Sequence, residues 1–187
     1  MAEKNFVRIY VNANSSKKVD IIIKQYSHFM DIVESCTDGL QYMIQCEKES
    51  NNRHRMGELG IRVHTSGVSD PTAKSAIRNV ITREAIINCD FSGDVLEGVN
   101  RAEEFMREAY LLRDMRMDYD LFKCQLSILG PEKELFEKFL CGKMTLFDIA
   151  EEEGISYEAA KQRIYRNRTR VKNQVMNFMK SKEGDIA

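Results

Sequence analysis

Apolar side chains recur every three or four residues along most of the chain, which is the spacing of one face of an α-helix. The first such stripe predicts a helix from about Lys18 to Glu49, which the segment 37–39 (Thr-Asp-Gly) could interrupt. Residues 6–11 (FVRIYV) are β-branched and aromatic, so they fit a short strand or an extended arm. Residues 12–18 have the composition of a turn.

Three more helices follow from the same spacing. Residues 50–69 are rich in Gly and Asn and predict a loop, after which Ser69-Asp70-Pro71 resembles a helix start, because Pro suits the first helical position. Apolar stripes at 73–86 and at 95–126 predict the second and third helices. A fourth helix is expected around 135–140, closed by Gly142.

The pattern as a whole favours an all-α fold, with no winged elements. A break near Leu129-Gly130-Pro131 suggests a helical N-terminal body over 1–128 and a three-helix helix-turn-helix module over 129–187. We expect the body to serve oligomerisation or contact with a polymerase. Its broad apolar stripe from Val19 to Ile44 is the candidate dimer interface, although an internal helix-hairpin core would explain the stripe equally well.

The C-terminal module carries local signals for two helices joined by a sharp turn. Thr145 can cap a short helix, with Asp148 three residues on, and Gly154 can adopt the positive φ that a turn after that helix requires. Ser156 can cap the next helix. In this last helix an inward stripe is expected, made of Ala160, Ile164, Val171, Val175 and Phe178.

Charge is unevenly distributed along a chain whose formal net charge is −1. Residues 161–172 contain six basic side chains and no acidic one. A basic helix face is a common footprint of DNA binding, although most such faces are only solvated. On the first two turns, Lys and Gln side chains could recognise bases, and the arginines further along are better placed for phosphates.

The segment from Gly130 to Lys172 resembles region four of sigma factors, particularly the extracytoplasmic-function type. The matching motifs are 145–150 (TLFDIA), 154–156 (GIS) and 159–171 (AAKQRIYRNRTRV). The resemblance implies a helix-turn-helix that binds promoter DNA, and the sigma domain that melts DNA has no counterpart in the N-terminal part. The general layout, and the segment Ser69–Ala73, also resemble phage late transcription regulators of the ArpU/RinA kind. We expect DNA contacts from Ser156, Tyr157, Glu158, Lys161, Gln162, Arg163, Tyr165, Arg166, Arg168, Arg170 and Lys172.

Other chemistry finds little support in the sequence. The five cysteines show no metal-ligand spacing and are interpreted as reduced, mostly buried thiols. His28, His54 and His64 are far apart, so no metal site is expected. No H-E-x-x-H, G-x-S-x-G or P-loop pattern appears, so neither an enzyme nor a cofactor is expected. A loop with Arg53, Arg55 and Arg62 is either solvated or a second DNA contact. No apolar run is long enough for a membrane span, and we expect a cytoplasmic protein.

The leading hypothesis is a sequence-specific transcription regulator of phage or prophage type that binds double-stranded DNA as a dimer. A homo-oligomer is expected because one recognition helix specifies only a few base pairs. Two alternatives stay open. One is a divergent sigma factor that binds core RNA polymerase, and the other is a DNA-packaging protein similar to a phage small terminase.

Overall fold

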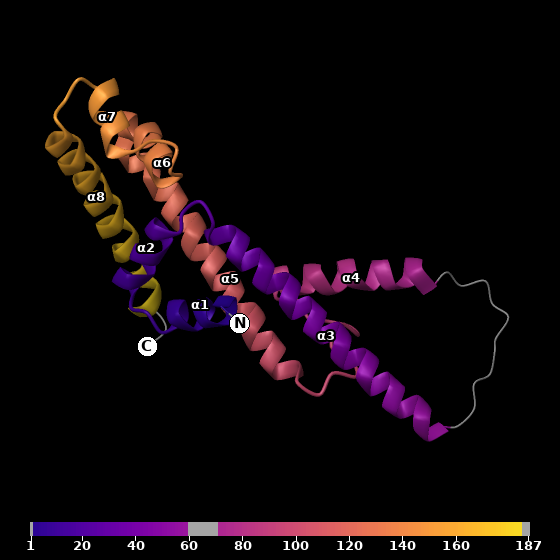
Figure 1. The fold of residues 1–187 in the computed structure, drawn as a ribbon. Helices are drawn as coiled ribbons and strands as arrows, with labels where there is room; N and C mark the ends of the chain where they lie inside the picture. Colours follow the sequence, from indigo (N-terminus) through magenta and orange to yellow (C-terminus); the bar gives the residue numbers. More distant parts are fainter. Residues whose placement is uncertain (1, 60–70, 185–187) are drawn as a thin grey trace. The chain divides into compact units, whose positions relative to one another are not determined.

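The computed structural model describes residues 2–59 and 71–184, and within these ranges the regular structure is helical, with no strand (Figure 1). This confirms the all-α fold class. The elements are α1 (Ala2–Val11), α2 (Ser15–Lys24), α3 (Phe29–Leu59), α4 (Pro71–Asn88), α5 (Ala102–Gln125), the 3-10 helix η1 (Leu126–Glu132), α6 (Lys133–Leu140), α7 (Leu146–Glu152) and α8 (Tyr157–Gly184). None of the described helices combines the length and the apolar character needed to cross a membrane.

The segment 6–11 is helical, so the predicted strand or extended arm is wrong. Phe6 and Tyr10 lie one helical turn apart in α1, and the rings of both pack edge-on against Phe29, at centroid distances of 6.0 and 5.4 Å. An extended backbone would separate the two residues by about 13 Å, too far for both rings to reach one partner. Tertiary packing thus overrides the β propensity of this segment.

The long first helix is interrupted at a different place from the one expected. The break is the turn 25–28, whereas Gly39 continues α3, where a Cβ atom at this position would meet only open space. Asn14 caps α2 by accepting a hydrogen bond from the backbone N–H of Lys17 at 2.9 Å. Helix α3 also runs on through 50–59, which corrects the first half of the predicted loop.

The remaining part of that loop, 60–69, and the capping residues Ser69 and Asp70 lie outside the described residues. Helix α4 begins at Pro71, as predicted. The apolar stripe of α4 is only half used, since Ala85 and Ile86 are buried whereas Ile77 and Val80 are exposed.

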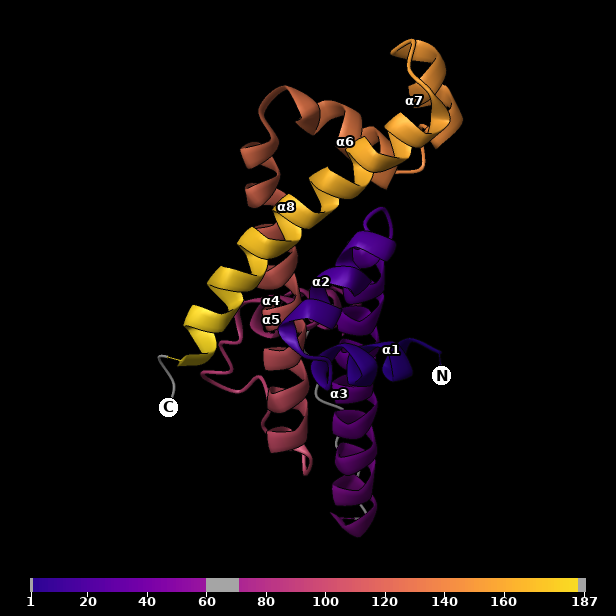
Figure 2. The ribbon, with the colours of Figure 1, turned by 90° about the vertical axis from the view of Figure 1, so that its left-hand side faces the viewer.

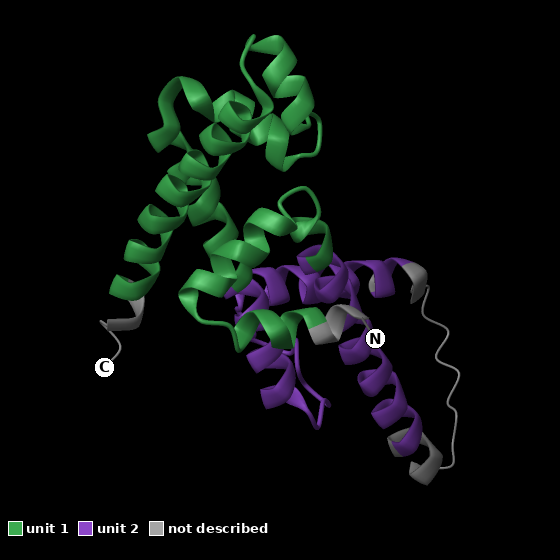
Figure 3. Cartoon of the chain, turned by 60° about the vertical axis from the view of Figure 1, so that its left-hand side comes forward, with its two compact units in different colours: residues 1–32, 115–187 green, residues 33–114 purple. Residues whose placement is uncertain are grey.

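The chain forms two compact units, residues 1–32 with 115–187, and residues 33–114 (Figure 3). The boundary expected near Leu129 lies inside the first unit, within η1. The reason is that α2 packs against α8, so an N-terminal segment joins the C-terminal helices. In Figures 1 and 2, α7 lies beside the first turns of α8, and α2 lies beside later turns.

The core of the first unit includes a polar contact that the sequence did not suggest. Asp118 is buried and accepts a hydrogen bond from the Tyr10 hydroxyl at 3.1 Å. Burial, and then the neighbouring Asp118, raise the pKa of Tyr10. The apolar core of this unit includes Tyr10, Val19, Ile22, Phe29, Met115, Phe122, Leu126, Phe136, Ile149, Ala160, Val171 and Val175.

The second unit is built from the later part of α3, α4 and the first part of α5. Its buried apolar residues include Val33, Leu40, Ile44, Ile86, Phe105 and Leu112. The stripe from Val19 to Ile44 is therefore largely buried inside the chain itself, which favours the core explanation over a dimer interface. The cysteines are free thiols, but Cys46 and Cys124 are exposed and the other three are half-buried, so the expected burial is wrong.

Candidate nucleic-acid interface

Helix α7 starts at the predicted cap. The Thr145 hydroxyl accepts a hydrogen bond from the backbone N–H of Asp148 at 3.3 Å, and the Asp148 carboxylate accepts one from the backbone N–H of Thr145 at 2.7 Å. The hydrogen bonds that the carboxylate receives from Thr145, first from its backbone N–H, hold the pKa of Asp148 below its usual value. Ile149 is buried beneath this helix. The reciprocal capping fixes where α7 begins and hence where its following turn lies.

The turn between α7 and α8 also follows the predicted residues. Gly154 has a φ of 62°, a conformation that glycine adopts without the steric cost it imposes on other residues. The next residue closes the turn, because the backbone N–H of Ile155 donates to the carbonyl of Ala150 at 3.0 Å. The Ser156 hydroxyl then accepts from the backbone N–H of Ala159 at 3.2 Å and caps α8.

One side of α8 packs against the rest of the first unit. Ala160, Ile164, Val171 and Val175 are buried as predicted. Phe178 was expected to continue this stripe, but 47% of it is exposed, and Met179 is buried in its place at 4%. The buried positions are spaced four residues apart from Val171 to Val175 and from Val175 to Met179. The prediction used a spacing of three for the last step, so it named the residue one position too early.

The opposite side of the first turns presents five predicted site residues together. We call this surface the outer face of α8. Its side chains line one shallow hollow and are all exposed: Glu158, Lys161, Gln162, Tyr165 and Arg166. Eight residues separate its ends, so the outer face is about 12 Å long. Ser156 and Tyr157 are exposed at its N-terminal edge.

An aromatic pair at this edge includes a residue that sequence reasoning missed. Phe147, at the second position of α7, packs against Tyr157 with ring centroids 4.7 Å apart, and 70% of it is exposed. The sequence could have indicated this residue. Some first-turn positions of a capped helix are exposed, and an aromatic side chain at such a position does not pack in the core. Such a pair can offer apolar contact to a ligand that approaches the outer face.

Arg163 lies elsewhere, although the family resemblance implied a DNA contact for it. Its guanidinium donates to both carboxylate oxygens of Glu132 in η1, each at 2.6 Å, and to Glu153 at 2.8 Å. Asn167, one turn further along α8, donates to the same Glu132 carboxylate at 3.2 Å. We call these four residues the Arg163 cluster. It holds α8 against the segments on either side of α7.

The electrostatics of the Arg163 cluster agree with a firm ion pair. The hydrogen bonds from Arg163 hold the pKa of Glu132 below its usual value, and those to Glu132 raise the pKa of Arg163. The two side chains are 28% and 29% exposed, so water screens the pair less than it would on an open surface. Two parallel hydrogen bonds also fix the orientation of the guanidinium plane.

Two more of the predicted cations meet a carboxylate of α2. Arg168 donates to Asp20 at 2.8 Å, and Lys172 donates to the second oxygen of the same carboxylate at 2.6 Å. Partial burial acts to raise the pKa of Asp20, but the hydrogen bonds from Lys172 and Arg168 outweigh it, so the pKa lies below its usual value. Arg170 is exposed and forms no ion pair with other residues of the described ranges.

The remaining candidate chemistry is not brought together. Within the described ranges no group of three His, Cys, Asp or Glu side chains could hold a metal ion. Arg53 and His54 are exposed on α3, and Arg53 donates to the carbonyl of Glu49 within the same helix. The side chain of Arg55 and all of Arg62 and His64 lie outside the described residues.

The outer face of α8 is thus exposed, and the Arg163 cluster and the buried stripe hold the helix from the other side. Compared with family models, with curated proteins and with solved structures, the chain matches none of them.

Proposed function

We propose that the protein is a sequence-specific DNA-binding transcription regulator, of phage or prophage type, which binds double-stranded DNA with α8. One observation carries the proposal. The outer face presents a lysine, a glutamine, a glutamate, a tyrosine and an arginine together on an exposed helix whose other side is anchored. Lys and Arg pair with guanine, Gln pairs with adenine, and Glu accepts from cytosine.

The dimensions support the same proposal. An α-helix with its side chains is about 10–12 Å across, and the major groove of B-DNA is roughly 12 Å wide, so α8 can enter the groove. A helix inserted into the groove must be held rigidly from behind, because a shift of its side chains would exchange one base contact for another. The Arg163 cluster and the buried stripe from Ala160 to Val175 supply that support.

The test is selection of binding sites from random DNA with the full chain. The wild type should select a defined sequence, and Lys161→Ala or Gln162→Ala should lose preference at one or two positions, each worth about 1–3 kcal/mol. The matched control is Arg170→Ala, which should weaken binding to all sequences alike. Failure of the wild type to select any sequence at moderate salt would refute the proposal.

The same protein preparation separates the alternatives. A divergent sigma factor would form a stable complex with core RNA polymerase, and a packaging protein would form a ring without affecting transcription. The proposed regulator is expected to be a dimer on two half-sites. A mass measurement in solution, with and without the selected DNA, distinguishes a dimer from a ring.

A further inference from the structure

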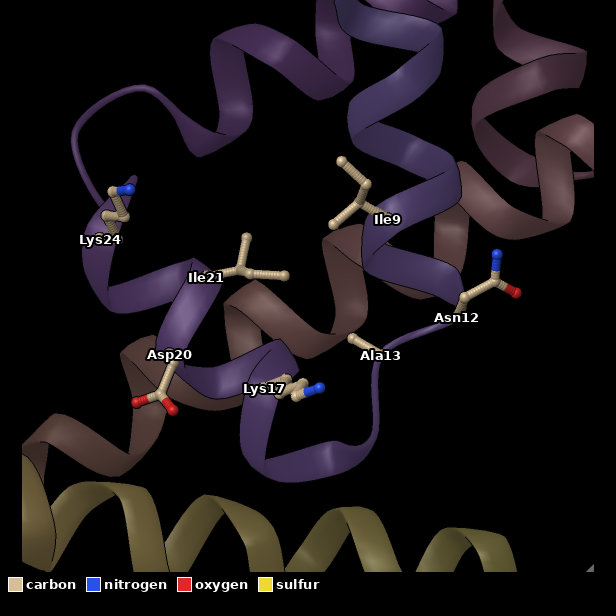
Figure 4. Close-up of a pocket in the computed structure, with 7 residues that line it drawn as sticks. All are labelled: Ile9, Asn12, Ala13, Lys17, Asp20, Ile21 and Lys24. Atoms are coloured by element: carbon tan, nitrogen blue, oxygen red, sulfur yellow. The ribbon is translucent and has the colours of Figure 1, made fainter.

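The surface between α1 and α2 carries two exposed lysines on either side of the aspartate that binds α8. Figure 4 shows its lining, with Lys17, Asp20 and Lys24 all on α2 and Ile9 on α1. The two lysines are one turn before and one turn after Asp20, so the three residues share one side of the helix. Lys17 and Lys24 are both exposed.

Helical periodicity relates this surface to the outer face of α8. Seven residues make nearly two full turns, so Arg168 lies almost directly beyond Lys161, and Lys172 lies beyond Tyr165. Arg168 and Lys172 are the two residues that Asp20 binds. Helix α2 is therefore fastened to α8 at the point where the outer face would otherwise continue.

The attachment of α2 to α8 at Arg168 and Lys172 determines which part of a bound DNA α2 would contact. In a helix-turn-helix the N-terminal residues of the recognition helix contact base edges, and the outer face occupies this part of α8. Positions 168–172 lie about 10 Å further along the axis than positions 161–165, so in such a complex they would lie beyond the base-contacting turns and nearer the phosphate backbone. Asp20 carries one negative charge at this point, and Lys17, Lys24, Arg168 and Lys172 carry four positive charges.

We propose that α2 is a second DNA-contact element, in which Lys17 and Lys24 bind the phosphate backbone that borders the groove occupied by α8. Asp20 acts here as a positioning residue, because it binds two cations of α8 and so fixes α2 at the groove edge. The inference rests on the proposed function and extends it, since it assigns contacts to a segment about 140 residues away from the helix-turn-helix motif. A phosphate contact contributes affinity and salt dependence without sequence preference.

The test compares Lys17→Gln and Lys24→Gln with Lys123→Gln, which changes an exposed lysine of α5 in the same unit. Affinity for a duplex with the selected sequence, and for one with an unrelated sequence, is measured from about 50 to 200 mM salt. Each α2 variant should lower the slope of log affinity against log salt by about 0.9. Its deficit relative to wild type should therefore shrink about 3.5-fold over this range, equally for both duplexes.

The possible outcomes separate the two proposals. If both α2 variants behave like Lys123→Gln while the wild type binds its selected sequence, the α2 contact is overturned and the proposed function stands. A change in sequence preference in either α2 variant would also overturn it, since phosphates carry no sequence information directly. If the wild type binds neither duplex at the lowest salt, the proposed function itself fails. Unchanged thermal unfolding of the lysine variants excludes a folding defect.

Discussion

The ion pair between Glu132 and Arg163 should contribute measurably to the stability of the chain. The perturbation is Glu132→Gln, which keeps the shape of the side chain and removes its charge. The variant leaves Arg163 with Glu153 as its remaining carboxylate partner and replaces one acceptor oxygen by an amide that cannot accept a hydrogen bond. Glu132→Gln therefore removes a contact between η1 and α8 that consists of two hydrogen bonds between charged groups.

The magnitude follows from the geometry and the exposure of the pair. A hydrogen bond to a charged group contributes about 1.5–3 kcal/mol, whereas an exposed ion pair contributes about 0–1 kcal/mol. Both side chains are a little under one-third exposed, so we expect an intermediate loss of about 1–2 kcal/mol. For a chain of this size, that corresponds to a fall in Tm of about 2–8 °C.

The assay is thermal unfolding followed by circular dichroism. Glu134→Gln is the matched control, because Glu134 lies two residues away and pairs with Lys138 on an exposed surface of α6. It should leave the Tm almost unchanged, since such a pair is screened by water. Equal Tm values for wild type and Glu132→Gln would refute the stabilising role of the Arg163 cluster.

The dependence on pH gives an independent check. The pKa of Glu132 in the folded chain lies below its usual value of 4.5, so folding favours the charged carboxylate. Its contribution to the free energy of unfolding is then fully present above about pH 5 and is lost as the pH falls through the folded-state pKa. The difference in Tm between wild type and Glu132→Gln should shrink in acid. A difference that persists unchanged at low pH would contradict the electrostatic origin.

Two local predictions concern the turn and the caps. Thr145→Ala should lower the free energy of unfolding by about 1 kcal/mol, because it removes the cap of α7. The control Thr169→Ala, at an exposed position of α8, should not have this effect. Thermal unfolding compares the two variants, and equal losses of stability would argue against the capping role. Gly154→Ala should destabilise the chain by about 1 kcal/mol because its φ is positive, whereas Gly39→Ala should stabilise α3 by about 0.4–1 kcal/mol. If both glycine variants shift the midpoint of urea unfolding in the same direction, the conformational argument is wrong.

Features that depend on residues within one helical turn were predictable from the sequence. Thr145, Gly154 and Ser156 occupy the conformations that were assigned to them, because a cap or a turn involves a side chain and a backbone group only a few positions away. The inward stripe of α8 was predictable for the same reason as far as Val175. At the end of the helix the prediction failed by one position, because Met179 is buried and Phe178 is exposed.

Features that depend on distant partners were not predictable. The helical state of 6–11 requires Phe29, and the joining of α2 to α8 requires contacts across about 150 residues. Periodicity indicates whether a cation points inward or outward, but it does not reveal a carboxylate from another helix. Glu132 and Asp20 therefore went unnoticed, although they bind three of the predicted site residues.

The ion pairs with Glu132 and Asp20 give part of the positive charge of α8 a structural role. Of its six basic residues between 161 and 172, Arg163, Arg168 and Lys172 are bound by carboxylates of other helices or turns and so hold α8 in place. Lys161, Arg166 and Arg170 remain exposed for an external partner. A helix that bound DNA by charge alone would have little reason to engage half of its cations in contacts within the chain. The arrangement instead supports the proposals that a rigid outer face discriminates among bases and that α2 supplies part of the phosphate contact.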